Sequence, residues 1–273
     1  MSASRYGDGM SLPVDVTQTV TTFLTAVDRS APGLVEGLYL CGSLGFGEYV
    51  AGHSDVDFVA VLAERPGRAA LDALAAAHAS VRAEHPRPFL DGLHAVRADL
   101  ARSPDECPDL PCTRNGEYRE AGRFGVDPVT WHELARHSVP VRGPRLTEAD
   151  VWTDDAALRA YSRRNLAEYW SGTAAAIAAD PRAAAGPFAA EWCVLGVSRL
   201  HHLLATGALT TKSGAGRYAL TAFEAHWHPI ITEALALREG SPSSYGEDTA
   251  RRGADTVAFT AMAVEAGLAL PVP

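Results

Sequence analysis

The sequence predicts two domains: a sheet with covering helices over residues 1–145, and an all-helical domain over residues 146–273. Two observations carry this prediction. Strand-like apolar runs alternate with helical periodicity through the first half, and no convincing strand pattern follows Gly143-Pro144. Such alternation is typical of an α/β sheet. With 273 residues, of which 47% are hydrophobic, the chain is long enough to bury both cores.

In the first domain, the apolar pattern indicates helices at residues 14–27, 69–84 and 128–137. Strands are expected at residues 37–41, 56–62, 89–96 and 139–143. Residues 42–52 form a glycine-rich turn. Residues 103–126 are expected to be a loop, because they carry Pro, Gly and mixed charge without periodicity. In the second domain, helices are expected at residues 158–179, 189–206, 218–226 and 256–268.

Composition restricts the location and the partners of the protein. The four cysteines form no disulfide framework, and the closely spaced Cys107 and Cys112 lack two further zinc ligands, so free thiols are expected. Residues 1–12 lack the apolar run of a signal peptide, and no stretch approaches the ~20 apolar residues of a membrane span. We therefore expect a cytoplasmic monomer without a membrane partner.

The formal net charge of −9 argues against a nucleic-acid partner, which requires a basic surface. A negative potential attracts cations, so the charge fits a cationic or neutral small-molecule substrate better. Part of this charge serves solubility alone.

The segment over residues 41–62, CGSLGFGEYVAGHSDVDFVAVL, carries the pattern with chemical meaning. Ser43 follows an expected strand, in a turn where Gly42, Gly45 and Gly47 relieve steric restriction. Exposed N–H groups and a hydroxyl in such a turn can hold a phosphate. The segment matches neither the P-loop nor the dinucleotide-binding glycine pattern.

Asp55 and Asp57 flank Val56 where the next strand is expected to begin. Residues two apart on a strand point to the same face, about 6.5 Å apart, so both carboxylates can converge on a divalent cation. Mg²⁺ favours a few carboxylates together with phosphate oxygens, and the segment therefore predicts a magnesium site beside a phosphate. The alternative is a turn-capping Asp55 and a solvated Asp57, because Asp-x-Asp is a common pattern.

Asp91 is the candidate for a third carboxylate, because it lies within the apolar strand expected over residues 89–96. A buried acid is costly unless it meets a metal ion or a hydrogen-bond donor. The alternative is an Asp that ends a strand or turn beside Gly92.

Gly42-Ser43 followed by Asp55-x-Asp57 resembles the motif of the DNA polymerase beta-like nucleotidyltransferase superfamily. More narrowly, the chain is similar to the aminoglycoside adenylyltransferases that modify streptomycin and spectinomycin. Three segments carry this narrower resemblance, which extends from about residue 35 to about residue 225: HSDVDFVAVL over residues 53–62, DPVTWHELARHSVPVRGP over residues 127–144, and the helix–turn–helix of residues 192–220.

The resemblance implies an α+β/α fold class, in which a mixed sheet flanked by helices precedes a C-terminal all-helical bundle. It also implies that Asp55 and Asp57 bind Mg²⁺ and that ATP is the co-substrate. Asp91 would be the base that accepts the substrate hydroxyl proton, or a third metal ligand. Family members closest to the streptomycin enzymes carry Glu at this position, and the Asp here is shorter.

The same resemblance implies a set of residues that contact the nucleotide phosphates. These are Gly42, Ser43, Ser54, Arg199 and Lys212. Independently, Arg199 shares one helical face with apolar Trp192 and Leu195, where an Arg needs an anion or a partner carboxylate; a salt bridge between the domains is the alternative. Lys212 is expected in a loop, where a merely solvated lysine is the alternative.

The acceptor is the point at which the chain departs from the family. The family grips its drug with a Trp and acidic residues just before the Arg-bearing helix. Here residues 180–191 are mostly apolar, and Asp180 and Glu191 are the acids available to an ammonium group. Three functions therefore stay open: a Mg²⁺-dependent transfer of AMP to a hydroxyl of an aminoglycoside-type antibiotic, the same chemistry on another metabolite, protein or RNA end, and a non-catalytic nucleotide-binding relative.

Overall fold

The computed structural model describes residues 12–271, so the N-terminal segment assessed for a signal peptide lies almost wholly outside the described residues. The chain divides into two compact units, the first ending at Asp154 and the second beginning at Asp155. The sequence placed this boundary after residue 145. The segment that follows packs with the sheet unit instead, because Leu146 and Val151 are buried in its core and Trp152 N donates to Leu100 O at 2.7 Å.

A six-stranded mixed sheet forms the centre of the first unit, with strand order β5-β4-β3-β2-β1-β6. β2 and β3 run parallel, and the other neighbouring strands run antiparallel. The strand bounds are β1 Val35–Leu40, β2 Val56–Leu62, β3 Leu90–Val96, β4 Leu110–Arg114, β5 Glu117–Gly122 and β6 Val139–Arg142. The mixed sheet that the family resemblance implied is therefore confirmed.

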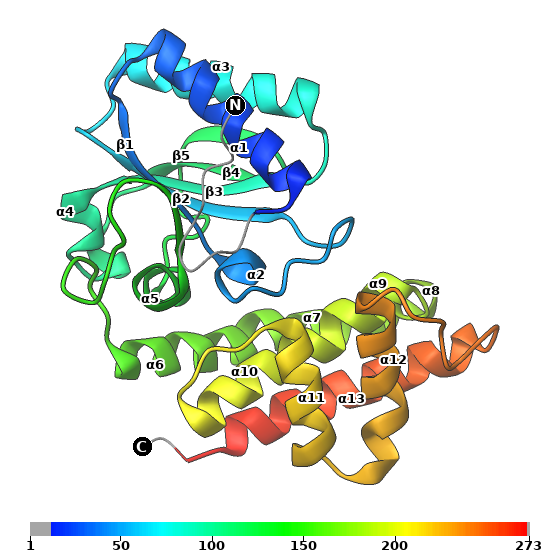
Figure 1. Ribbon diagram of the computed structural model, residues 1–273. Coiled ribbons are helices and arrows are strands. Elements are labelled where there is room, and N and C mark those ends of the chain that lie inside the picture. Colours follow the sequence, from blue (N-terminus) through cyan, green and yellow to red (C-terminus); the bar gives the residue numbers. More distant parts are fainter. Residues whose placement is uncertain (1–11, 272–273) are drawn as a thin grey trace. The chain divides into compact units, whose positions relative to one another are not determined.

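Helices cover both faces of this sheet (Figure 1). The helices α1 (Val14–Ser30) and α3 (Arg68–Glu84) pack on one face, and α5 (Pro128–His137) packs on the other. The short helices α2 (Gly42–Gly45) and α4 (Arg97–Leu100) follow β1 and β3. Successive residues of β2 alternate between the two cores, with Phe58 under α1 and α3 and Val59 on the α5 face.

One expectation for this unit was wrong. Residues 103–126 were expected to be a loop, but they contain the hairpin of β4 and β5, after a 3-10 turn at Pro104–Glu106. The hairpin turns at Asn115 and Gly116, whose φ values of +53° and +69° suit a two-residue Asn-Gly turn. β5 is mostly exposed and therefore lacks the apolar alternation by which a strand is recognised.

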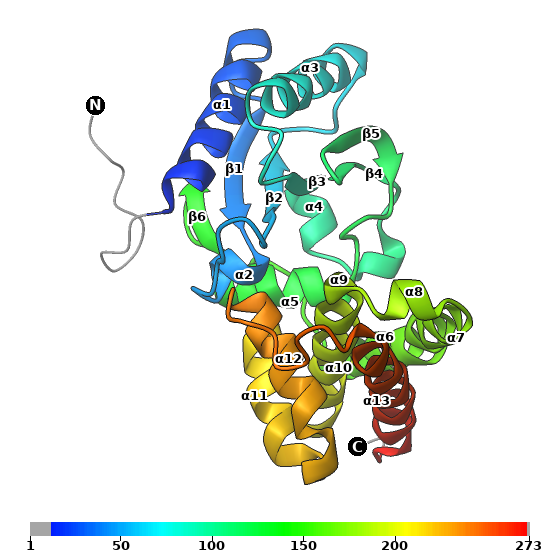
Figure 2. The same cartoon turned by 90° about the vertical axis from the view of Figure 1, so that its right-hand side faces the viewer.

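The second unit is helical throughout its described part, in agreement with the sequence (Figure 2). Its α-helices are α6 Asp155–Asn165, α7 Ser171–Ala179, α8 Pro181–Ala184, α9 Pro187–Ala189, α10 Leu195–Thr206, α11 Lys212–Ala222, α12 His228–Arg238 and α13 Thr249–Ala269. Wider π-helical turns at Leu166–Trp170 and Ala190–Val194 lead into α7 and α10, and a 3-10 turn at Ala225–Trp227 precedes α12. The sequence did not predict α12, and it placed Lys212 in a loop although Lys212 begins α11.

The second unit contains a buried ion pair between Glu233 and Arg252. Glu233 is fully buried and accepts hydrogen bonds from Ser243 Oγ at 2.6 Å and from Ser244 N at 2.7 Å. Arg252 Nη1 donates to the same carboxylate at 3.3 Å and also binds the carbonyl of Ala185. Burial opposes the charge of Glu233, but these donors outweigh it and lower its pKa. One carboxylate therefore ties α12 to α13 and to the segment that follows α12.

Within the described residues, no helix is both long and apolar enough to cross a membrane. Cys41, Cys107, Cys112 and Cys193 are all buried free thiols, as expected.

Two buried histidines meet between α3 and the sheet. His78 Nε2 and His94 Nε2 lie 3.2 Å apart, and their residues are 3% and 1% exposed. Aromatic rings of Phe23, Phe58 and Tyr118 surround them. Burial lowers the pKa of both imidazoles, that of His94 to about 4, so both are neutral at neutral pH.

We expect the free energy of unfolding to fall as the pH decreases from about 6.5 toward 4. In this window the unfolded chain binds protons on these histidines while the folded core keeps them neutral, so protons favour the unfolded state. The pKa shift of His94 corresponds to ~3 kcal/mol at full effect. Urea unfolding near neutral pH and near pH 5 measures the change. A His78→Leu/His94→Leu variant should depend less on pH, whereas the exposed-site control His226→Leu should behave as wild type; equal pH dependence in all three proteins would contradict this account.

Candidate active site around the Gly42-Ser43 turn

The turn after β1 packs directly against a carboxylate of β2. Gly42 has a φ of +55°, and a Cβ at this position would overlap Asp57 Oδ2. Cys41 N also donates to Asp57 O at 2.9 Å, so the backbone of the turn is joined to the start of β2. Position 42 therefore requires glycine for two reasons, its left-handed conformation and the close approach of Asp57.

The backbone N–H groups of residues 41–44 fall into two sets, those that donate within the protein and those that do not. Cys41 N is taken by Asp57 O, and Gly42 N donates to Glu133 Oε2 at 3.1 Å. Among the hydrogen bonds of the described residues, none is donated by Ser43 N or Leu44 N. Together with the Ser43 hydroxyl, they are the donors that the turn can offer to a phosphate.

Glu133 is a site residue that the sequence did not indicate. It lies in the middle of α5, and only 7% of its surface is exposed. Burial, together with the nearby charges of Glu133 and Asp57, raises the pKa of the Cys41 thiol well above its usual value, and this places both carboxylates beside the turn. A single Glu within an amphipathic helix carries no signal of such a contact, because its partner lies 91 residues away in the chain.

Asp57 and Asp91 are direct partners in the register of the parallel strands β2 and β3. Residues paired in this way lie on neighbouring strands about 4.8 Å apart and on the same face of the sheet. By alternation with Val59 and Leu93, that face is the one covered by α5. The strands approach closely at the next pair, where a Cβ on Gly92 would overlap the carbonyl oxygen of Phe58.

Asp91 is buried and held by the β4–β5 turn. Its residue is 5% exposed, and its carboxylate accepts from Asn115 N at 2.7 Å and from Gly116 N at 2.9 Å. Burial raises the pKa of Asp91; these two N–H groups lower it in part, and the charge of Asp55 raises it further. The hairpin that the sequence missed thus holds a predicted site residue.

Asp55 lies just before β2 and is about 40% exposed. Arg87 Nη1 lies 3.4 Å from Asp55 Oδ1, and the Arg87 guanidinium stacks on Phe89 at 3.7 Å from the ring centroid. Ser54, the preceding residue, is buried, and its hydroxyl accepts from Val50 N at 3.1 Å. The Ser54 hydroxyl therefore holds the backbone of the glycine-rich segment at Val50. Arg87 is a cation beside Asp55 that no sequence pattern indicated.

The donor set fits a magnesium ion. Asp57 and Asp91 are neighbours on one face, and the charge of Asp55 disfavours ionisation of Asp91, a repulsion that a cation would relieve. Among the described residues, no group of three or more His, Cys, Asp or Glu side chains is arranged to hold a metal by itself. Mg²⁺ commonly takes one or two carboxylates and completes its shell with phosphate oxygens and water, so a carboxylate pair suffices.

Within the helical unit, the predicted phosphate-binding cations occupy two neighbouring helices. Arg199 lies half-buried on α10, and Lys212 begins α11. Lys212 Nζ lies 3.7 Å from Glu191 Oε1 and 4.9 Å from the centroid of the Trp192 ring. Arg238, which is 4% exposed, binds the same Glu191 oxygen at 3.1 Å.

The two acids expected to be available to an acceptor ammonium are both engaged in the structure. Glu191 pairs with Lys212 and Arg238. Asp180 caps α8 by accepting from Arg182 N and Ala183 N, each at 3.1 Å.

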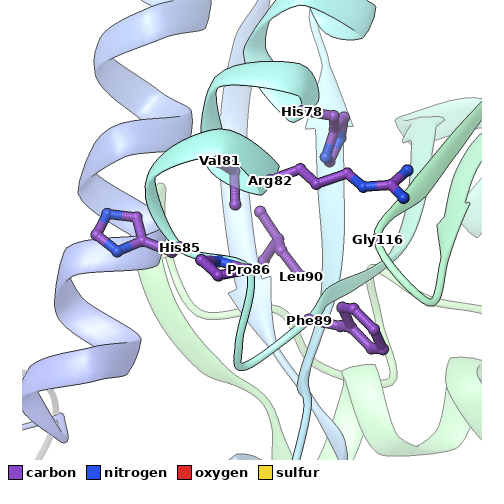
Figure 3. A pocket seen from close by; sticks show the side chains of 8 residues that line it. All are labelled: His78, Val81, Arg82, His85, Pro86, Phe89, Leu90 and Gly116. Carbon is purple, nitrogen blue, oxygen red and sulfur yellow. The ribbon is translucent and has the colours of Figure 1, made fainter.

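The sheet unit contains a small cavity (Figure 3). It is lined by His78, Val81, Arg82, His85, Pro86, Phe89, Leu90 and Gly116. None of the predicted site residues is among them. The cavity therefore does not mark the nucleotide site.

The fold is similar to that of a solved structure, the spectinomycin adenyltransferase AAD(9) from Enterococcus faecialis with ATP and spectinomycin. The TM-score is 0.58 at 13% sequence identity, and the match covers 91% of this chain and 99% of that chain. No protein-family sequence model and no curated protein sequence matches the chain. At this identity the likeness establishes the fold, and it confirms the α+β/α fold class that the sequence resemblance implied.

We expect Gly42→Ala to weaken binding of MgATP at least tenfold, because the methyl group displaces the Asp57 carboxylate or the turn. Isothermal titration calorimetry measures the affinity. Gly52→Ala is the matched control: Gly52 also has a positive φ, +81°, but a Cβ there meets nothing within 4 Å. Both substitutions introduce a similar backbone strain of about 1–2 kcal/mol. Equal affinities in the two variants would show that the Asp57 contact is irrelevant to nucleotide binding.

Proposed function

We propose that the protein is a Mg²⁺-dependent nucleotidyltransferase that transfers AMP from ATP to a hydroxyl group of a small molecule and releases pyrophosphate. The observation that carries this proposal is the packing of the Gly42-Ser43 turn against Asp57, whose register partner is Asp91. A phosphate-holding turn and two adjacent carboxylates are what transfer of a nucleotidyl group requires from a protein. The fold shared with an adenyltransferase supports the same conclusion.

The side chains divide into groups with separate tasks. Ser43 and the N–H groups of its turn hold the triphosphate, and Ser54 supports the segment that follows the turn. Asp55 and Asp57 would hold Mg²⁺, which when bound would neutralise negative charge on the phosphate groups. Arg199 and Lys212, both in the helical unit, are proposed as cations that bind nucleotide phosphate.

We assign Asp91 the role of general base. Its buried carboxylate, with a raised pKa, is a stronger proton acceptor than an ordinary exposed aspartate. The N–H groups of Asn115 and Gly116 fix its orientation, and each carboxylate oxygen retains a second lone pair for a substrate hydroxyl. The same lone pairs would allow it to act instead as a metal ligand beside its register partner Asp57.

For the acceptor, we propose an aminoglycoside-type antibiotic. The solved adenyltransferase of the same fold holds spectinomycin together with ATP, and the net charge of −9 favours a cationic acceptor. A different hydroxyl-bearing metabolite is the second candidate. The engagement of Glu191 and Asp180 within the chain favours it, because these were the acids expected to bind a drug ammonium.

The direct test is pyrophosphate release from MgATP in the presence of a panel of aminoglycosides and other polyhydroxyl compounds. We expect release that requires both Mg²⁺ and one class of acceptor, and we expect Asp57→Asn to abolish it. Asp109→Asn, at an exposed position just before β4, controls for the general effect of removing one carboxylate. Binding of MgATP without pyrophosphate release on any aminoglycoside would move the assignment to another acceptor, and no binding of MgATP at all would reject the function.

We expect Asp91→Asn to lower kcat by about 10²–10⁴ while leaving MgATP affinity nearly unchanged, because a positioned base acts on the reacting hydroxyl. The N–H₂ of the introduced amide would face the N–H of Asn115 or Gly116, so two donors would meet without an acceptor. The melting temperature of the variant should therefore fall slightly. In the wild type, kcat/KM should rise with pH through a pKa above the ordinary aspartate value. A variant with full kcat would remove Asp91 from the chemistry.

A further inference from the structure

The Gly42–Gly45 turn rests on α5 at both of its ends. At the first end, Gly42 N donates to Glu133 Oε2. At the other end, a Cβ on Gly45 would overlap the carbonyl oxygen of His137, and the Phe46 ring stacks on the His137 ring with centroids 4.2 Å apart. Both views of the fold show α2 beside α5 (Figures 1 and 2).

The two α5 residues that make these contacts lie four positions apart, so they share one face of the helix. Glu133 reaches the start of the turn, and His137 lies under its end. A buried carboxylate needs hydrogen-bond donors, and a backbone N–H supplies one in a charge-assisted bond. The contact is thus the kind by which a rigid helix fixes the orientation of a neighbouring turn.

From this geometry we infer that Glu133 is a positioning residue for the nucleotide. It acts through Gly42: by holding that N–H, its carboxylate fixes the direction in which the following donors, Ser43 N, Leu44 N and the Ser43 hydroxyl, present themselves to a phosphate. The inference rests on the proposed nucleotidyltransferase function and adds a residue of α5 to its site.

A direct electrostatic role of the same side chain predicts different behaviour. Glu133 and the Asp57 carboxylate both lie against Gly42, so the negative charge of Glu133 would also attract a cation to the site. In that case the charge of residue 133 matters and its hydrogen bond does not. Two conservative substitutions separate these roles, because Gln keeps an oxygen acceptor at the same reach without the charge, and Asp keeps the charge without the reach.

The experiment measures MgATP affinity by calorimetry for full-length wild type, Glu133→Gln and Glu133→Asp. We expect Gln to bind within about twofold of wild type, and Asp about tenfold more weakly, the effect of losing one charge-assisted hydrogen bond. At saturating MgATP, kcat of both variants should remain close to that of wild type, because the substitutions leave the proposed base Asp91 in place. The defect of Glu133→Asp should therefore appear in the KM for MgATP alone. Glu148→Asp is the control. Glu148 lies outside α5 and pairs on an exposed surface with Arg136 of that helix at 2.5 Å, so the substitution shortens a carboxylate that contacts α5 away from the turn.

A second readout does not depend on nucleotide binding. Amide hydrogen exchange of the segment around Gly42 in the nucleotide-free protein should be faster in Glu133→Asp and unchanged in Glu133→Gln and Glu148→Asp. Weak binding by Gln with normal binding by Asp, equal impairment of both, or wild-type affinity and exchange in both would each overturn the inference. If wild type fails to bind MgATP, the proposed function fails, and the exchange pattern alone then decides whether Glu133 orients the turn.

Discussion

The contact between Gly42 and the Asp57 carboxylate is the constraint on which the site depends. It joins the end of β1 to the start of β2 with no space for a side chain between them. The backbone bond from Cys41 N to Asp57 O closes the same junction. Because both strands are fully buried over most of their length, the junction cannot shift without disturbing the core, and the turn and the carboxylate keep a fixed relation.

Burying several carboxylates near one another costs free energy, and hydrogen bonds and an ion pair offset part of that cost. Asp91 accepts two backbone N–H groups, Glu133 accepts one, and Asp55 pairs with Arg87. The compensation at Asp91 is incomplete, because burial and the charge of Asp55 leave its pKa raised. A site of this kind gains stability when a cation arrives, which is the electrostatic condition for binding a metal–nucleotide complex.

Much of this arrangement could be predicted from local sequence, and the remainder could not for identifiable reasons. β2 and α5 begin and end where the apolar pattern placed them, since both are short elements with a clear periodicity. β5 escaped detection because it is an exposed edge strand, and its Asn115-Gly116 turn was the sole local signal. Glu133 had no local signal at all, because its importance comes from a contact across the fold.

Sheet topology explains why residues far apart in the chain gather at one place. β2 and β3 are parallel and joined by the crossover through α3, so their first residues lie side by side and Asp57 becomes the partner of Asp91. β1 runs antiparallel to β2 and therefore ends where β2 begins, which delivers the Gly42-Ser43 turn to the same edge. α5 then covers the face to which both carboxylates point. The turn, the carboxylate pair and the supporting helix thus converge because of strand direction.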